Sequence, residues 1–248
     1  MMDKFLYISM TGAKEAMTSM TVRANNLANS STTGFKSDYN QYRTMAVFGG
    51  ELPSRAYAMS ERPGTDTTEG SYITTGRDLD VAINGKGWFA VQTPEGKEAY
   101  TRAGDLKRSS EGIITTSSGL PVMGNGGPIF LPEYEKLVIG TDGTISIRGL
   151  GENPLALTQI DRLKLVNGSD GLLDKGLDGL FHLKDKNAGE LDADIGVTMV
   201  SGVLEGSNVN SVGELTDMIS ASRLFEMNIK MMENAKSNDE AAARIMQG

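Results

Sequence analysis

Apolar side chains recur at heptad spacing near the start of the chain, and this pattern restricts the fold more than any other feature of the sequence. The positions follow one another in steps of four and three: Leu6, Met10, Ala13, Met17, Met20, Ala24 and Leu27. This spacing predicts a helix with one narrow apolar seam. Because the seam holds small residues and flexible methionines, it suits one or two partner helices. We therefore expect a coiled-coil helix and its terminating motif in residues 1–35.

The segment that should end this helix is rich in asparagine, hydroxyl side chains and glycine, and reads NNLANSSTTGFK over residues 25–36. Asn and Gly tolerate the left-handed conformation that ends helices, and Ser/Thr hydroxyls compete with helical backbone bonds. The heptad alone also fits an ordinary amphipathic helix with a polar end. The cluster Asn25, Asn26 and Asn29, followed by Gly34-Phe35, is more specific.

A second heptad stripe closes the chain and predicts a second coiled-coil helix within residues 204–248. Its members are Leu215, Met218, Ser222, Phe225, Ile229 and Met232. Asn210 or Ser211 is suited to cap this helix, and Glu214 is placed like the acidic partner of a capping box. Each seam is too narrow to hold its helix alone in water, so the two should pack against each other or against other subunits.

Between the helices the sequence predicts an extended connector, residues 36–78, and an all-β domain, residues 79–203. The connector is interpreted either as a surface loop or as an arm that extends along a neighbour in an assembly. From Leu79 the apolar residues alternate, and the turn at residues 84–87 predicts a hairpin that leads into Trp88. Short strands with turns between them indicate a barrel-like or sandwich domain. The expected fold class is therefore mixed, with terminal helices flanking a central all-β domain.

Composition excludes several function classes. The net charge is −8 with no run of Lys or Arg, which argues against nucleic-acid or anionic-membrane binding. No apolar stretch approaches twenty residues, so we expect no membrane insertion. The start of the chain lacks the features of a signal peptide, which by itself suggests a cytoplasmic protein. Zero Cys excludes disulfides and thiol catalysis.

The sequence also offers little for catalysis, a cofactor or a metal. Asp78 and Asp80 form an Asp-x-Asp pair, but turn-forming or solvated carboxylates are the favoured interpretation. His182 is the only histidine, so no His pair is present to bind zinc. A triad around His182 stays open, although no nucleophile elbow supports it. Trp88 after a turn is more typical of a core residue than of a ligand platform. We expect a protein that is not an enzyme and has no cofactor.

The two ends of the chain and several internal segments resemble the bacterial flagellar rod and hook axial proteins. The N-terminal signature is the Asn25–Lys36 segment, and the C-terminal one is SGVLEGSNVN, residues 201–210, with the helix that follows it. The middle of the family is matched by GRDLDVAI at residues 76–83, GKGW at 85–88 and YTRAG at 100–104. Trp88, the segment 162–166 and Asn210 are similar to the proximal-rod branch. The extra Met1 suggests that Met2 is the initiator.

This resemblance implies a structural subunit that passes torque through interlocked helices, with the β domain facing outward. It implies export through the flagellar type III apparatus without a cleavable signal peptide, and assembly in the periplasmic rod. The implied partners are other rod proteins, copies of the chain itself and the export apparatus. The implied assembly interface comprises both heptad seams together with Asn25, Asn26, Asn29, Gly34 and Phe35. Rival interpretations are a distal-rod or hook protein, and a β-domain carbohydrate enzyme that uses Asp78 and Asp80.

Overall fold

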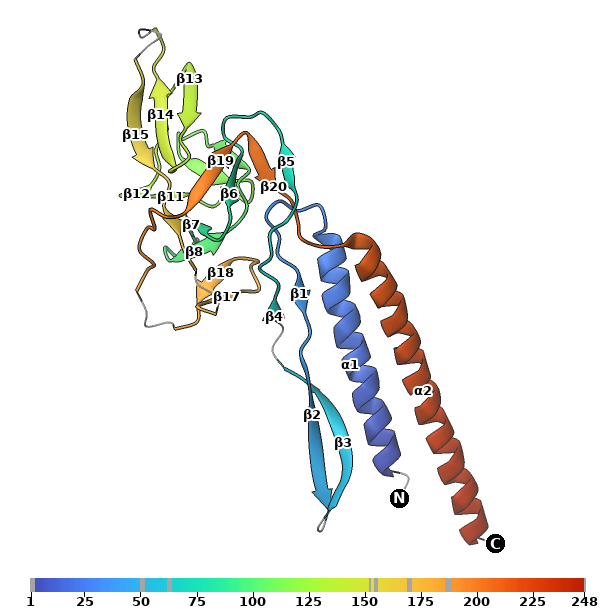
Figure 1. Cartoon of the computed structure of the whole chain (residues 1–248). Coiled ribbons are helices and arrows are strands. Elements are labelled where there is room, and N and C mark those ends of the chain that lie inside the picture. The colour runs from blue at the N-terminus through green and yellow to red at the C-terminus, as the bar shows by residue number, and fades with distance from the viewer. Residues whose placement is uncertain are drawn as a thin grey trace. The chain divides into compact units, whose positions relative to one another are not determined.

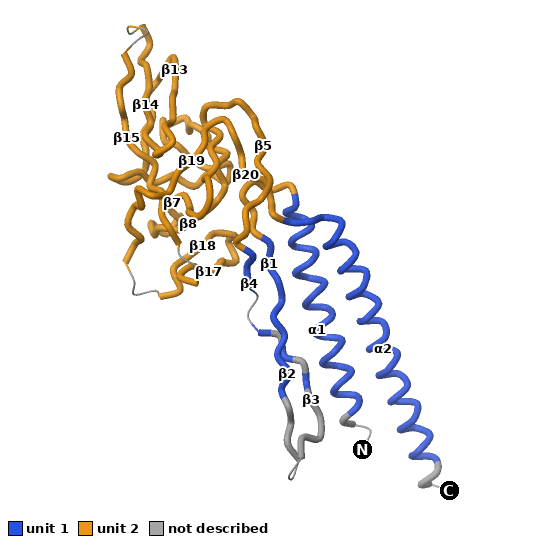
Figure 2. Tube along the Cα trace, in the orientation of Figure 1, with its two compact units in different colours: residues 1–30, 37–66, 209–248 blue, residues 31–36, 67–208 orange. Residues whose placement is uncertain are grey.

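The computed structural model describes residues 3–49, 52–61, 64–151, 153, 156–168, 171–185 and 189–247. The chain divides into two compact units, and Figure 2 colours them separately. Unit 1 comprises residues 1–30, 37–66 and 209–248, and unit 2 comprises residues 31–36 and 67–208. A helix opens the described chain, another closes it, and β structure lies between them in sequence (Figure 1). The predicted mixed fold class is confirmed.

Unit 1 is built around two helices, α1 (Asp3–Ala28) and α2 (Ser211–Gln247). They lie side by side and antiparallel: Arg23 near the end of α1 pairs with Glu214 at the start of α2, while Ser9 reaches Met231 further along. Asn210 caps α2, because its Oδ1 accepts a hydrogen bond from the Gly213 N–H at 3.2 Å. The predicted capping box is wrong, since the carboxylate of Glu214 bonds to α1 instead.

Four strands complete unit 1, and all lie in the segment predicted as an extended connector. Strand β1 (Asp38–Tyr39) pairs with β4 (Gly64–Thr65), and β2 (Tyr42–Gly49) pairs with β3 (Leu52–Ser60), both antiparallel. The β2–β3 pair carries a register shift between Val47 and Phe48. The sequence-based division did not contain this pairing. Its boundaries also differ from those of the units, because residues 67–78 and 204–208 belong to unit 2.

Unit 2 contains the remaining strands. They are β5 (Tyr72–Thr74), β6 (Val81–Asn84), β7 (Trp88–Gln92), β8 (Glu98–Thr101), β9 (Leu106–Arg108), β10 (Ile114–Thr116), β11 (Met123–Gly124), β12 (Gly127–Pro128), β13 (Lys136–Ile139), β14 (Thr144–Arg148), β15 (Thr158–Arg162), β16 (Leu165–Val166), β17 (Leu173–Lys175), β18 (Phe181–Leu183), β19 (Thr198–Ser201) and β20 (Val203–Glu205). The largest sheet has the order β16-β7-β8-β18-β17, and β13-β14-β15 form a second one. The other pairs are β9 with β10, β11 with β12, β6 with β19, and β5 with β20.

The predicted hairpin across residues 84–87 is wrong, although both of its strands exist. Strand β6 pairs with β19, and β7 pairs with β8 and β16. Between β6 and β7 the chain passes from one sheet to another, and the φ angles of Gly85 and Gly87 are positive. An Asn-Gly turn indicates where the chain reverses, but the pairing is decided by strands that arrive much later in the sequence.

The core of unit 2 consists of large aliphatic and aromatic side chains. The main cluster runs from Val81 and Ile83 through Phe89 and Leu106 to Met199. A smaller one contains Trp88, which lies 4.1 Å from Phe181 between ring centroids. The prediction that Trp88 is a core residue is confirmed, since it is buried.

Candidate assembly surface

The contact between α1 and α2 is made by small side chains. On α1 the buried positions are Ser9, Ala13 and Ala16 and, near the end of the helix, Asn26. A Cβ atom on Gly12 would lie 2.7 Å from Oδ1 of Asn228 on α2, so the two helices approach each other closely there. Ala221 and Ala235 are the buried apolar residues of α2. Small residues at the contact leave most of the larger apolar side chains outside it.

The predicted seam of α1 therefore lies partly beside the helix contact. Ala13 is buried and Met20 and Leu27 are half-buried, whereas Leu6, Met10, Met17 and Ala24 are exposed. On α2, five predicted positions are half-buried: Met218, Ser222, Phe225, Ile229 and Met232. Leu215 is exposed, as are Ile219, Leu224, Met227 and Met231, which the heptad did not include. Whether the predicted set forms an interface in an assembly stays a prediction.

Asn26 joins three elements of unit 1 and is fully buried. Its Nδ2 donates to the carbonyl of Asp38 at 2.8 Å and to Oε1 of Glu214 at 2.9 Å, and its Oδ1 accepts from the Asp38 N–H at 2.9 Å. The side-chain amide thus donates one hydrogen bond to the Asp38 backbone and accepts one from it, as a neighbouring β-strand would. Arg23 adds an ion pair to Glu214 at 3.1 Å. Sequence analysis assigned this asparagine to the end of the helix and missed its role as a link between α1, β1 and α2.

The other two asparagines of the signature stand at the end of α1. Asn25 is exposed and Asn29 is half-buried. The Nδ2 of Asn29 donates to the carbonyl of Asn25 at 2.9 Å, which satisfies one of the carbonyls left open at a helix end. These two residues therefore serve the local helix end that the sequence predicted.

Gly34 begins a buried junction in unit 2. Its φ angle is +66°, which favours glycine, and a Cβ there would clash with the backbone of Arg102 and Ala103. Its N–H donates to the carbonyl of Glu205 at 2.7 Å. Phe35 is half-buried, and its ring lies 3.9 Å from Nζ of Lys175. The glycine and the phenylalanine of the signature are thus explained by contacts within this chain.

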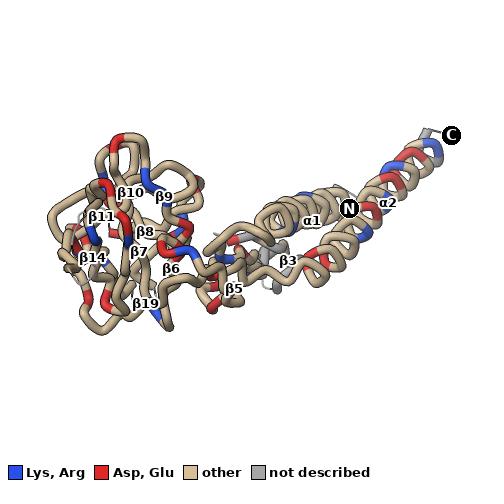
Figure 3. Tube along the Cα trace, turned by 90° about the horizontal axis from the view of Figure 1, so that it is seen from above, with Lys and Arg blue, Asp and Glu red and all other residues tan. Residues whose placement is uncertain are grey.

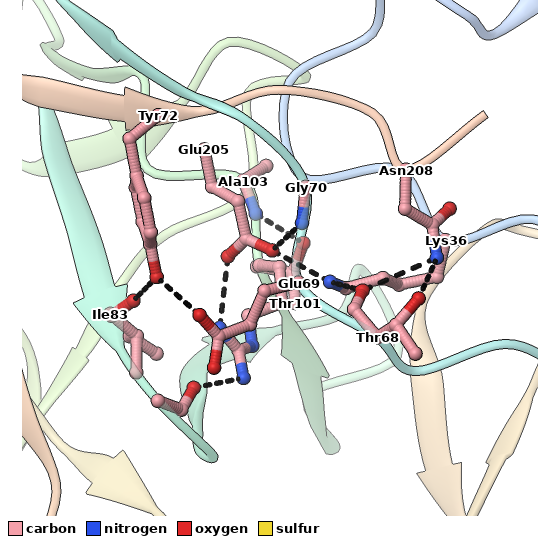
Figure 4. A network of polar contacts seen from close by, with 12 residues as sticks. Lys36, Thr68, Glu69, Gly70, Tyr72, Ile83, Thr101, Ala103, Glu205 and Asn208 are labelled. Atoms are coloured by element: carbon pink, nitrogen blue, oxygen red, sulfur yellow. Dashed lines mark hydrogen bonds and ion pairs between the residues drawn. The ribbon is translucent and has the colours of Figure 1, made fainter. Parts of the chain in front are cut away.

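Lys36, Glu205 and Arg102 form a buried ionic network, which Figure 4 shows from close by. The side chains of Lys36 and Glu205 are 0% exposed and that of Arg102 is 3% exposed. Nζ of Lys36 lies 2.6 Å from Oε1 of Glu205, and Arg102 bonds to Oε2 at 2.9 Å. Lys36 also donates to the carbonyl of Thr68 at 2.6 Å. A single carboxylate therefore pairs with two buried cations.

Burial lowers the pKa of Lys36, while its hydrogen bond to Glu205 acts in the opposite direction. Arg102 donates a second bond to the carbonyl of Gly85 at 2.7 Å and lies over the ring of Trp88 at 5.3 Å. Nearby, Tyr72 contacts Glu69 and the carbonyl of Ile83, and burial raises its pKa. The network joins residues 31–36 and 67–72 to strand β20 within unit 2.

The residues considered for catalysis do not form one site. Asp78 is exposed, whereas Asp80 is 1% exposed and lies 3.6 Å from Arg77. The prediction of a solvated carboxylate is therefore wrong for Asp80. His182 is paired with Asp178 at 2.9 Å in a half-exposed position. In the described part of the chain, no three His, Cys, Asp or Glu residues are grouped as metal ligands.

Charged side chains of both signs are interspersed along α2 (Figure 3). None of the helices in the described residues is long and apolar enough to cross a membrane.

Three family models match successive parts of this chain. "Flagella basal body rod protein" covers residues 6–36, "Flagellar hook protein FlgE/F/G D1 domain" covers residues 82–147, and "Flagellar basal body rod FlgEFG protein C-terminal" covers residues 200–245. The chain is 39% identical over 249 residues to flagellar basal-body rod protein FlgF of Escherichia coli K12, a match that covers 99% of both chains. The chain belongs to the flagellar basal-body rod protein family.

FlgF of Salmonella typhimurium is likewise 39% identical over 99% of both chains, and FlgG of Agrobacterium fabrum is 33% identical over 97% of both. The resemblance read from the signatures, including its leaning towards the FlgF branch of this rod protein family, is confirmed. The matched regions contain both helices, and the first ends at Lys36 in the ionic network.

Proposed function

We propose that this chain is a structural subunit of the bacterial flagellar basal-body rod, which polymerises through α1 and α2 and transmits torque by packing. The observation that carries the proposal is the set of apolar side chains that both helices leave exposed after they pack together, among them Leu6, Met17, Ile219 and Met227. Burial of one such side chain stabilises an interface by about 1.5–3 kcal/mol. The names of the family relatives support the same role.

Within the rod, we place the chain in the proximal part. The 39% identity to FlgF of Escherichia coli and Salmonella typhimurium, against 33% to FlgG of Agrobacterium fabrum, supports this placement, as do Trp88 and Asn210. The proposed neighbours are other rod proteins and copies of the chain itself. Export through the flagellar type III apparatus to a periplasmic site, without a cleavable signal peptide, belongs to the same proposal.

The alternative of a distal-rod or hook subunit is tested by complementation. We expect the gene to restore swimming to a strain that lacks FlgF and not to one that lacks FlgG. The reverse result would assign the chain to the distal rod.

A carbohydrate enzyme that uses Asp78 and Asp80 gains no support from the geometry. Asp78 is exposed and Asp80 is buried, and Asp80 faces Arg77. The relatives are named as rod proteins. A non-enzymatic role, without cofactor, nucleic acid or membrane insertion, therefore remains our proposal.

The assembly surface is tested at Met17, which is exposed near the middle of α1. Met17→Asp should block incorporation into basal bodies, because an unpaired carboxylate buried in an interface costs several kcal/mol. In the free chain the same aspartate lies in water and costs only its helix propensity, about 0.5 kcal/mol. Subunit content of purified basal bodies is the measurement, with thermal unfolding of the purified chain beside it.

Met17→Leu is the matched control, since it keeps an apolar side chain of similar size at the same position. We expect this variant to assemble normally. If Met17→Asp assembles as well as Met17→Leu does, α1 is not the assembly surface.

A further inference from the structure

All sulfur in this chain is thioether, because the sequence has 14 Met and no Cys. The described methionines range from exposed through half-buried to buried. Met10 and Met17 on α1 are 50% and 62% exposed, and Met227 and Met231 on α2 are 53% and 42% exposed. Met199 in the core of unit 2 is 1% exposed. An oxidant dissolved in water therefore reaches the helix sulfurs and not that of Met199.

The exposed methionines of each helix share one face. Met10 and Met17 are seven residues apart, which places them two turns apart on the same side of α1. Met227 and Met231 are four residues apart on α2 and form a second such pair. The hydroxyl of Ser9, which is buried, donates to the sulfur of Met231 at 3.9 Å. One helix methionine is thus already part of the α1–α2 contact through its sulfur.

Oxidation would change these side chains from apolar to polar. A methionine sulfoxide carries an oxygen atom that needs a hydrogen-bond donor, and such oxidation disrupts methionine-rich interfaces. In the free chain the oxygen of a sulfoxide at Met17 is solvated. After assembly, as proposed above, the same oxygen would be buried among apolar side chains without a donor.

We propose that Met10 and Met17 form a modification site at which a peroxide controls whether the free subunit can assemble. The sulfur attacks one peroxide oxygen, the O–O bond breaks, and a sulfoxide and water result from hydrogen peroxide. The sulfur loses two electrons and the peroxide gains them. Methionine sulfoxide reductases reverse the change. This inference rests on the proposed function, because it concerns the surface through which the subunit is proposed to assemble.

The first experiment maps the reaction on the purified full chain. Graded hydrogen peroxide is added, and peptide mass spectrometry follows each methionine over time. We expect sulfoxide at Met10 and Met17 to form at least about tenfold faster than at Met199, with an unchanged helical circular dichroism signal because both residues face water. Equal rates at Met17 and Met199 would overturn the proposal.

The second experiment measures assembly in cells that depend on this chain and receive sublethal peroxide while the rod is built. Incorporation of the wild type should fall about tenfold, the effect of one unsatisfied buried polar group. The double variant Met10→Leu/Met17→Leu should fall by a clearly smaller factor, since of the four exposed helix methionines only Met227 and Met231 remain to be oxidised. Met45→Leu/Met59→Leu is the matched control, because both residues are exposed on β2 and β3, and it should respond as the wild type does.

The outcomes separate this inference from the proposed function. If peroxide reduces the Met10→Leu/Met17→Leu variant as strongly as the wild type, the modification site is refuted, while a block by Met17→Asp still supports the assembly surface. If Met17→Asp assembles normally, the assembly surface and with it this inference are both refuted.

Discussion

In unit 2 most of the buried apolar side chains are large aliphatic or aromatic ones, whereas the buried apolar residues of the two helices of unit 1 are alanines. Burial of an alanine contributes far less than burial of leucine or isoleucine, so the helix pair gains little from its own contact. Its larger apolar residues stay exposed instead, Met17 and Ile219 among them. Unit 2 thus has a core of large apolar side chains, although it also leaves some exposed, such as Phe130 and Ile195, whereas no large apolar side chain among the described helix residues of unit 1 is fully buried.

The polar groups of the two units differ in a similar way. Unit 2 buries an ionic network at Glu205, while unit 1 has the buried neutral amide of Asn26 between α1, β1 and α2. Separate signals report on the two units. The only tryptophan, Trp88, lies in unit 2, and both helices of the described chain lie in unit 1. Tryptophan fluorescence and helical circular dichroism therefore follow the two regions independently.

The largest effect is expected from Glu205→Gln. This change keeps the shape of the side chain but leaves Lys36 and Arg102 buried without a counter-charge. The free energy of unfolding of unit 2 should fall by about 3–5 kcal/mol, measured by urea unfolding with Trp88 fluorescence. The control is Glu95→Gln in the exposed pair with Lys97, where we expect a change below about 0.5 kcal/mol. Similar effects of the two variants would show that the network is not what stabilises unit 2.

A smaller loss is expected in unit 1 from Asn26→Ala. It removes three hydrogen bonds and leaves the backbone groups of Asp38 without this partner, which should cost about 2–3 kcal/mol. Thermal unfolding followed at the helical circular dichroism band is the measurement. The neighbouring change Asn25→Ala, at an exposed position of the same helix, should alter stability by less than about 0.5 kcal/mol. If Asn25→Ala costs as much, the effect comes from the helix end and not from the buried link.

The smallest effect is expected on the stability of unit 2 at alkaline pH. Burial raises the pKa of Tyr100 from 10.0 to about 12. Between these values the folded chain keeps a proton that the unfolded chain has lost, so stability is fully present below pH 10 and falls as the pH rises to about 12. The total loss should be about 2–3 kcal/mol, since one pKa unit corresponds to about 1.4 kcal/mol.

Tyr100→Phe isolates this effect, since it removes the titrating group and keeps the ring. The lowered pKa of Lys36 has the opposite effect on stability. Just below the ordinary lysine pKa of 10.5, the unfolded chain binds more protons than the folded chain, so stability rises with pH there. The quantity to measure is therefore the difference between wild type and Tyr100→Phe across pH 9–12 in urea unfolding. A difference that does not change with pH would mean that Tyr100 titrates normally in the folded chain.

The sequence predicted the parts of this fold that follow from local periodicity. Both helices, their order around the β region and the buried position of Trp88 could be read from spacing and turn residues. The face through which α1 meets α2 could not be predicted. The buried or closely packed positions there are Ser9, Gly12 and Ala16. Such small residues also occur on exposed helix faces, so the sequence does not show which of them lie in a close helix contact.

The buried junction was hidden for a different reason. Lys36 and Glu205 each belong to a segment that the sequence singled out, residues 25–36 and 201–210, but they lie 169 residues apart and nothing local pairs them. The chain has 32 Asp and Glu residues, and nothing in the sequence around Glu205 distinguishes it as a buried one. The same holds for Asp80, which forms an isolated β-bridge with Asp105 and whose carbonyl accepts a hydrogen bond from the Gly202 N–H at 2.7 Å. Pairing across such distances is decided by the tertiary fold.

The separation between Lys36 and Glu205 has a consequence for the time course of folding. Closing a loop of 169 residues costs about 4–5 kcal/mol of chain entropy, so this ion pair should form only after the strands between its two residues have assembled. During synthesis at about 5–20 residues per second, Lys36 is made roughly 10–30 s before Glu205. For that interval the ammonium group of Lys36 lacks its carboxylate partner, although the carbonyl of Thr68 is already present as an acceptor, and the buried junction of unit 2 can close only once Glu205 has been added.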